Sequence, residues 1–190
     1  MISAIGMTQT PQEQVDDESS KAVVYDIIQL SKAKNVSEID KKYIHPEYGV
    51  YDVFIIGVPD NFEHHSSLAF ALPTGNNDSV YPNLLEISNT IMLPELKSYN
   101  AKYDCNEMVW DCEGFFVTDS IYYPKLSAVI KQPVFETSKF PESLHTQAKH
   151  IEENSYRIVV TEFDIIFYLT KIDKRRYLTL FDRVTTDCSA

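Results

Sequence analysis

The stretch from Ile158 to Thr186 reads IVVTEFDIIFYLTKIDKRRYLTLFDRVTT and decides the fold class. It contains two apolar runs, residues 158–170 and 176–186, on either side of the polar segment KIDKR. Both runs are rich in β-branched and aromatic residues, which favour extended strands, and a short polar segment between two such runs is typical of a β-hairpin. The sequence therefore predicts an antiparallel hairpin as the closing element.

The same stretch predicts which residues oppose each other across this hairpin. If the chain turns at Asp173 and Lys174, the side chains of one face are apolar on both strands and form the core. On the first strand this face carries Phe163, Phe167 and Leu169. Their expected partners on the second strand are Val184, Leu180 and Leu178, respectively.

The other face of the hairpin is mixed in character and is the candidate binding site. The side chains expected there are Glu162, Asp164, Ile166 and Tyr168 on the first strand and Thr179, Phe181, Arg183 and Thr185 on the second. Asp164 is expected opposite Arg183, and a sheltered carboxylate beside an arginine and tyrosines is a candidate binding or acid–base site. The alternative is an exposed ion pair, which contributes at most ~1 kcal/mol. Burial of Asp164 decides between the two. The residues assigned to ligand binding are Glu162, Asp164, Tyr168 and Arg183.

Helices are expected ahead of this hairpin. One begins near Ser19, because the apolar residues that follow recur at helical spacing. A second fits VSEIDKKYI, residues 36–44, where Ser37 and Asp40 have the spacing of a capping box. It ends before Pro46, because the residue preceding a proline avoids the helical region. Residues 48–58 then predict a strand buried on both faces, and residues 122–130 and 142–153 predict two short helices.

Together these elements indicate an α+β fold, with N-terminal helices packed on a curved antiparallel sheet that ends in the hairpin. The 190 residues suit one domain. We expect residues 1–17, which are polar and acidic, to be a flexible lead-in, and residues 18–190 to form a single α+β domain. Residues 74–79, TGNNDS, are expected to be a loop, and residues 84–93 fit either a strand or a helix.

Charge and hydropathy argue against two classes of partner. The chain has 17 basic and 28 acidic residues and a net charge of −11, and no segment concentrates enough Lys or Arg to follow a phosphate backbone. Nucleic acid and anionic membrane surfaces are therefore poor candidates. The longest apolar runs are far shorter than the ~20 residues of a membrane-spanning helix. The N-terminal MISAIGMTQTPQEQ resembles the end of a signal peptide without its basic start, which favours export to the periplasm or cell envelope if Met1 is a misplaced start. Otherwise it is a polar N-terminus without function, and a cytoplasmic protein is expected.

Histidine and cysteine patterns predict neither a metal site nor a catalytic nucleophile. Adjacent His64 and His65 would point to opposite sides of a strand and lack the spacing of a zinc-binding helix. His45, before a proline, is expected to fix the turn between helix and strand by a local hydrogen bond. Cys105 and Cys112 could form a disulfide, although other pairings stay open, and no basic neighbour activates a thiol. No catalytic residue, metal or cofactor is assigned.

Three segments resemble a family of uncharacterised exported proteins of Bacteroidetes and Firmicutes. A helix leading through YIHPEYGV, residues 43–50, into a strand resembles their HP-x-x-GV segment. DCEG at 111–114, followed by two tyrosines, is similar to their glycine turn and aromatic helix, and RYL at 176–178 to their W-Y-L closing strand. The resemblance implies a cystatin-like α+β domain related to the nuclear transport factor 2 superfold. This chain departs from the family after GV, where it has YDVF, and at Arg176, which replaces a tryptophan.

The leading functional hypothesis is a non-catalytic binding or interaction module, exported or associated with the cell envelope, that uses the concave face of the sheet. Its partner is an unidentified small molecule or protein. The superfold hosts both enzymes and binding modules, so the resemblance does not choose between them. The main alternative is a small-molecule enzyme of the nuclear transport factor 2 type, with Asp and His as acid and base. A cytosolic structural or interaction protein is a third possibility.

Overall fold

The computed structural model describes residues 18–55, 60–71, 84–88, 92, 94–119, 125–132 and 140–189. The four helices are α1 (Glu18–Lys32), α2 (Val36–Tyr43), α3 (Leu126–Ile130) and α4 (Glu142–Asn154). The strands of the main sheet are β1 (Val50–Ile55), β2 (Asp60–His65), β3 (Leu96–Ser98), β6 (Phe115–Thr118), β7 (Ser155–Val160), β8 (Ile165–Ile172) and β9 (Arg175–Asp182). A small hairpin of β4 (Tyr103–Asp104) and β5 (Val109–Trp110) projects from the sheet, and short 3-10 turns include η1 (Leu68–Ala71), η2 (Leu84–Glu86) and η4 (Thr161–Phe163).

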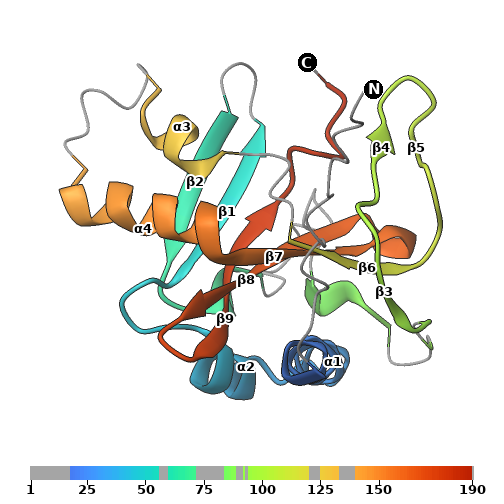
Figure 1. The fold of residues 1–190 in the computed structure, drawn as a ribbon, viewed down its shortest axis with the longest axis horizontal. Coiled ribbons are helices and arrows are strands. Elements are labelled where there is room, and N and C mark those ends of the chain that lie inside the picture. The colour runs from blue at the N-terminus through green and yellow to red at the C-terminus, as the bar shows by residue number, and fades with distance from the viewer. Residues whose placement is uncertain are drawn as a thin grey trace, which may run out of the picture.

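The α+β class is confirmed, but the sheet is mixed rather than antiparallel. Its seven strands have the order β2-β1-β9-β8-β7-β6-β3 (Figure 1). β1 pairs with β9 in parallel, and β3 pairs with β6 in parallel, whereas the other neighbours are antiparallel. The expectation of a purely antiparallel sheet is therefore wrong, because β1 runs parallel to the closing strand β9, and β3 runs parallel to β6.

Helices cover both faces of the sheet. On one face, α1 and α2 pack on a core that includes Ile27, Ile39 and Phe167. On the other, α3 and α4 pack on a second core that includes Tyr51 and Tyr168. Alternation along the strands explains this division, because successive side chains of a strand point to opposite faces. Strand β1 begins with four buried residues, in agreement with the prediction of a strand buried on both faces.

The predicted helices are found close to their expected positions. α1, α2 and α4 begin and end within a few residues of the predicted limits. Of the predicted helix 122–130, residues 126–130 form α3, and residues 122–124 lie outside the described residues. The cap of α2 is Asn35, whose side chain accepts a hydrogen bond from the backbone N–H of Glu38 over 3.3 Å. Ser37 and Asp40 therefore do not form the expected capping box. Residues 74–79 and part of 84–93 lie outside the described residues, and residues 84–86 of the latter form η2.

The closing hairpin is present as β8 and β9, but the predicted first strand is interrupted. Residues 161–163 form η4, and Asp164 adopts a left-handed conformation with φ of 53°. The chain therefore makes a meander of three strands, β7, β8 and β9, in place of one hairpin. Aspartate tolerates the left-handed region better than most residues, which makes it suitable for this position.

The predicted register holds only for the part of the hairpin near the turn. Leu169 opposes Leu178 as expected, but a bulge between Tyr168 and Leu169 shifts the pairing by one residue. Phe167 consequently opposes Phe181 instead of Leu180. The expected pair of Asp164 and Arg183 is wrong, because Asp164 precedes β8 and Arg183 follows β9.

Candidate functional site

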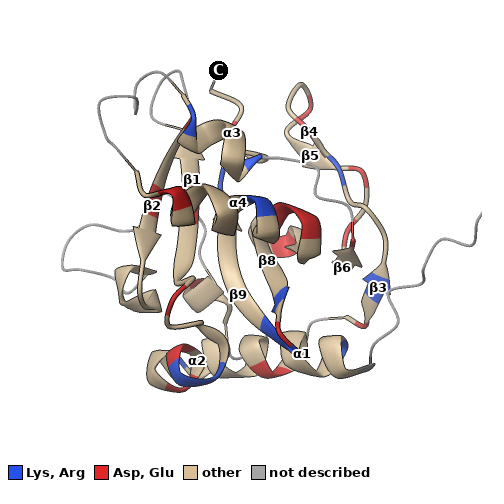
Figure 2. Cartoon of the chain, turned by 60° about the vertical axis from the view of Figure 1, so that its left-hand side comes forward, with Lys and Arg blue, Asp and Glu red and all other residues tan. Residues whose placement is uncertain are grey.

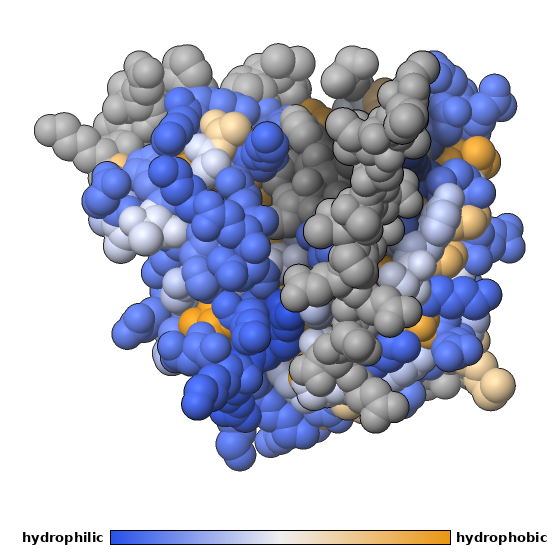
Figure 3. Space-filling view, viewed as in Figure 1, coloured by the Kyte–Doolittle hydropathy of each residue, from blue (hydrophilic) through white to orange (hydrophobic). Residues whose placement is uncertain are grey.

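A groove opens where the β4–β5 hairpin passes the η4 turn. Its volume of about 710 Å3 falls within the roughly 300–1,000 Å3 of small-molecule sites. The side chains that give it its chemical character are Tyr103, Met108, Trp110, Glu113, Glu162 and Asp164. Figure 3 shows apolar surface on the side of the molecule where this hairpin lies, and Met108 and Val109 are 69% and 53% exposed. The groove is therefore open to solvent along the hairpin.

Hydrogen bonds between Gly114 and Thr161 hold the two walls together. The N–H of Thr161 donates to the carbonyl of Gly114, and the N–H of Gly114 donates to the Thr161 hydroxyl, over 3.1 and 2.8 Å. Gly114 has φ of +148°, and a Cβ at this position would lie 2.9 Å from the ring of Phe116. A glycine is therefore required where the chain bends from the small hairpin into β6.

Asp164 and Trp110 form the centre of the groove. The indole Nε1 of Trp110 donates to the carboxylate of Asp164 over 2.7 Å, across 54 residues of sequence. The ring of Tyr103 meets the Trp110 ring edge to face, with centroids 5.2 Å apart. The left-handed conformation of Asp164 turns its carboxylate toward the hairpin, and the result is two fixed aromatic rings beside an acidic group.

The groove is acidic as well as aromatic. Glu113, Glu162 and Asp164 line it, and no Lys or Arg is among the described residues of its walls. The pKa of Tyr103 is raised, first by burial and then by the negative charge of Asp164. Aromatic faces beside carboxylates attract cations, since the ring quadrupole and the carboxylate charge act in the same direction.

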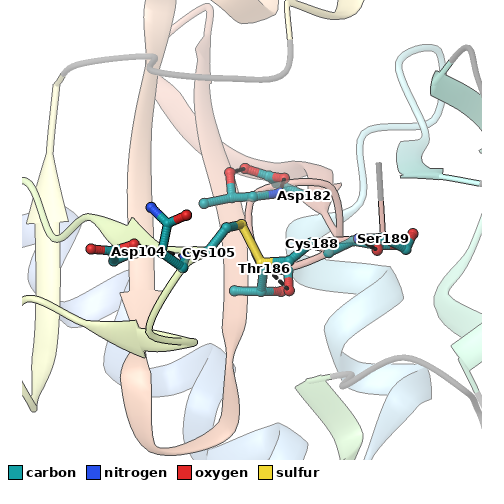
Figure 4. The surroundings of a disulfide bond; sticks show 9 residues. Asp104, Cys105, Asp182, Thr186, Cys188 and Ser189 are labelled. Carbon is teal, nitrogen blue, oxygen red and sulfur yellow. Dashed lines mark hydrogen bonds between the residues drawn. A yellow bond between two sulfur atoms is a disulfide. The ribbon is translucent and has the colours of Figure 1, made fainter.

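A disulfide fixes the far end of the small hairpin. Cys105, in the turn after β4, is bonded to Cys188, and the two Cα atoms lie 5.4 Å apart (Figure 4). Asp104 and Thr186 flank the bond in the same view. The pairing of Cys105 with Cys112, which we considered from the sequence, is therefore wrong. The disulfide joins the hairpin to the segment after β9 and so holds one wall of the groove in place.

The four residues assigned to binding from the sequence do not form one site. Glu162 and Asp164 line the groove. Tyr168 is buried in the core beneath α3 and α4, and Arg183 forms an ion pair with Asp52. The break at η4 causes this division. Glu162 and Asp164 were expected on the same strand as Tyr168, but both precede β8, which begins at Ile165.

Arg183 and Asp52 form a buried ion pair at the end of β9. The Nε atom of Arg183 lies 2.7 Å from Oδ1 of Asp52, and the two side chains are 10% and 8% exposed. Burial raises the pKa of Asp52, and the guanidinium of Arg183 opposes this shift. Both charges have their partner within the protein, so this pair is not a candidate ligand site.

Tyr168 belongs to a second buried polar cluster, with Arg157 and Asp182. Tyr168 hydrogen-bonds with both of these residues. The Asp182 carboxylate also accepts bonds from the N–H groups of Val184 and Thr185 and from the Thr185 hydroxyl. Burial raises the pKa of Asp182 to about 6, although these hydrogen bonds and the charge of Arg157 lower it.

His45 and His65 contact neighbouring groups of the chain. Nδ1 of His45 accepts hydrogen bonds from the N–H groups of Glu47 and Tyr48, over 3.2 and 3.3 Å, so the predicted turn-fixing role is confirmed. Gly49 follows with φ of +58°, where a Cβ would collide with the carbonyl of His65. His65 pairs with Glu63 at 3.2 Å. Within the described residues, no group of His, Cys, Asp and Glu has the arrangement of a metal site.

Cys112 is the one free cysteine among the described residues. Burial, followed by the neighbouring Asp111 carboxylate, raises its thiol pKa to about 11. The thiol is therefore protonated at neutral pH, which disfavours a role as nucleophile.

The sequence reasoning missed Trp110 and Tyr103 as site residues. A usable signal was present, because Trp110 is the single tryptophan of the chain and lies in a polar segment, NEMVWDCEG, where an aromatic core residue is not expected. Its partner Asp164 could not be identified from local spacing.

Comparison with known proteins identifies no relative of this chain. No family model matches the chain, and neither a curated protein nor a solved structure does. None of the helices in the described part of the chain is long and apolar enough to cross a membrane.

Proposed function

We propose that this protein is a non-catalytic binding module that holds a cationic ligand in the groove formed by Trp110, Tyr103 and Asp164. The observation that carries the proposal is the hydrogen bond between Trp110 and Asp164, which fixes an aromatic face beside a carboxylate. An alkylammonium group placed there would meet the rings of Trp110 and Tyr103 and the negative charges of three carboxylates. The ligand class is therefore a small molecule or peptide side chain with an ammonium group.

The site differs from the concave face that the sequence favoured. Helices pack on both faces of the sheet, whereas the groove lies at the η4 end of β7 and β8. A cystatin-like domain related to the nuclear transport factor 2 superfold stays part of the proposal. It is supported by the order of elements, in which N-terminal helices precede the sheet and a hairpin closes it.

Export to the periplasm or cell envelope is the second part of the proposal. The Cys105–Cys188 disulfide supports it, because structural disulfides persist in oxidising compartments and are rare in reducing ones. Labelling the thiols of protein taken from its native host tests this step. Protection of both cysteines is the expected result, and a wholly reduced protein would contradict export.

The single tryptophan gives a direct test of binding. Because Trp110 is the only tryptophan, intrinsic indole fluorescence reports on the groove alone. Titration with choline should give a saturable change with a Kd on the order of 1 mM, and the neutral isostere 3,3-dimethylbutan-1-ol should give none. Asp164→Asn, which keeps the shape and the hydrogen-bond acceptor, should weaken choline binding about tenfold.

Glu107→Gln is the matched control for Asp164→Asn. Glu107 is exposed in the β4–β5 turn and does not line the groove, so its replacement removes one negative charge nearby and should change the Kd less than about twofold. Equal responses to choline and to its neutral isostere would overturn recognition of the positive charge. An unchanged Kd in Asp164→Asn would remove this carboxylate from the site.

The enzymatic alternative has one observation in its favour. Asp182 has a pKa raised to about 6, which suits a general acid or base. Its carboxylate is fully used by backbone and side-chain donors, however, and is 2% exposed. Turnover of any small molecule by the purified protein, lost in Asp182→Asn with the fold intact, would favour the enzyme over the binding module.

A further inference from the structure

A second cavity, with the opposite charge, lies beside the turn that joins β8 and β9. Its volume is about 350 Å3, and it reaches from this turn to α1 and α2. Five basic residues line it: Lys42, Lys171, Lys174, Arg175 and Arg176. Figure 2 shows basic residues on α2 and, separately, at the lower end of β9 next to α1. The fold thus brings together a basic pocket in a chain with a net charge of −11.

Two of the five cations are held in place by the protein. The guanidinium of Arg176 lies 3.8 Å from the centre of the Tyr156 ring, and its Nη1 donates to the carbonyl of Asn154 over 2.9 Å. Lys42 lies 3.3 Å from the Asp26 carboxylate. Arg176 is therefore oriented before any ligand arrives, because stacking and backbone bonds fix its planar group.

The other three cations have no carboxylate within ion-pair distance among the described residues. Lys171, Lys174 and Arg175 are all exposed, and none of the three takes part in a salt bridge between described residues. Asp26, the ion-pair partner of Lys42, also accepts a bond from the Tyr43 hydroxyl. No described carboxylate therefore pairs with these three side chains, and the mutual repulsion of the cations decreases when an anion binds.

We infer that this pocket binds a compact dianion, with a phosphate monoester as the ligand class. Arg175 and Arg176 can present planar groups of N–H donors, and Lys171 and Lys174 add mobile ammonium groups. The cavity accommodates a phosphorylated small molecule but is far too small to follow a nucleic-acid backbone. Since the whole chain is strongly acidic, we assign the phosphate to a free small molecule rather than to a lipid headgroup.

Calorimetric titration of the intact, oxidised protein with glucose 6-phosphate tests this site. We expect saturable binding with a Kd on the order of 1 mM at low salt, an increase in Tm on addition, and no binding of glucose. Arg175→Gln should weaken the affinity about tenfold, and the double variant Lys174→Gln/Arg175→Gln should abolish saturation in the same range.

Lys97→Gln is the matched control, because Lys97 is exposed on the edge strand β3 and does not line the pocket. It removes the same charge and should change the Kd less than about twofold. These variants alter exposed side chains, so unchanged circular dichroism is expected and allows affinity to be read directly. Absence of saturable binding, or equal weakening by Lys97→Gln and Arg175→Gln, would overturn the proposal. Binding to phosphatidic acid vesicles but not to glucose 6-phosphate would overturn the assignment to a free ligand.

Discussion

Strand β9 begins and ends with charged residues, which are exposed at its start and buried at its end. At the start, Arg175 is exposed and faces the basic pocket. At the end, Asp182 is 2% exposed and the Arg183 side chain is 10% exposed, and both have partners inside the protein. Residue type therefore does not decide whether a charge serves a ligand or the fold. The decisive factor is whether another element covers the strand at that point.

The largest expected effect is that of Asp182→Ala at the covered end. This change removes the carboxylate whose charge interacts with that of buried Arg157, together with three hydrogen bonds to Val184 and Thr185. We expect a loss of ~4 kcal/mol in the free energy of unfolding, measured by urea denaturation. Asp187→Ala, which removes an exposed bond to Ser189, is the control and should cost less than ~1 kcal/mol. Similar losses in both variants would show that burial at this end has little energetic effect.

Arg183→Met is expected to cost somewhat less, ~3 kcal/mol, because it leaves the buried carboxylate of Asp52 without a counter-charge. Arg175→Met at the open end of the same strand should cost less than ~0.5 kcal/mol. The double variant Asp52→Val/Arg183→Met should recover most of the loss, since well-packed apolar residues replace a buried pair at little cost. Chemical denaturation of all three variants checks this. A double variant as unstable as Arg183→Met would contradict the assignment of the loss to an unpaired charge.

Lowering the pH should increase the contribution of Asp182, at the buried end of β9, to the free energy of unfolding by ~2 kcal/mol. The pKa of Asp182 is raised from 3.8 to about 6, so the folded state binds more protons than the unfolded chain between these values. The contribution of this group to stability is therefore greatest below pH ~4 and declines as the pH rises through 6. The stability difference between the native protein and Asp182→Asn should thus fall by about 2 kcal/mol from pH ~4.5 to pH ~7. A constant difference would show that Arg157 offsets the effect of burial.

Apart from the controls, the smallest effect on stability is expected from His45→Ala, beside the exposed start of β9. His45 accepts two backbone hydrogen bonds, and its ring lies edge to face with Tyr177 of β9, with centroids 5.0 Å apart. Its loss should cost ~1 kcal/mol, measured as a decrease in the denaturation midpoint, and leave choline and glucose 6-phosphate binding unchanged. Loss of either ligand with unchanged stability would mean that His45 serves a site instead of the turn.

The sequence predicted what depends on local pattern. The helices, the strand after His45 and the hairpin turn at Asp173 follow from periodicity and turn residues. The break at η4 could not be predicted, because the partner that satisfies Thr161 is Gly114, which lies 47 residues away. The same reason explains the division of the predicted binding site, since Arg183 pairs with Asp52 across 131 residues.

The disulfide and the groove also depend on contacts between residues that are far apart in the sequence. Cys105 and Cys188 are separated by 83 residues, and only the folded chain brings them together. Trp110 and Asp164 meet because a small hairpin folds back over a turn, which composition does not encode. Glu162 and Asp164, which the sequence assigned to binding, line the groove, but Tyr103 and Trp110 beside them come from a segment that the sequence did not assign to a site.

The position of β9 between β1 and β8 also has a consequence during synthesis. β1 is made early, but one of its two neighbours in the sheet, β9, is the last strand in chain order. Until β9 has left the ribosome, β1 and β2 can pair only with each other, and the apolar faces of α1 and α2 lack part of their core. A nascent chain in this interval exposes an unpaired strand edge, so it is the stage at which a chaperone would be needed and at which aggregation competes with folding.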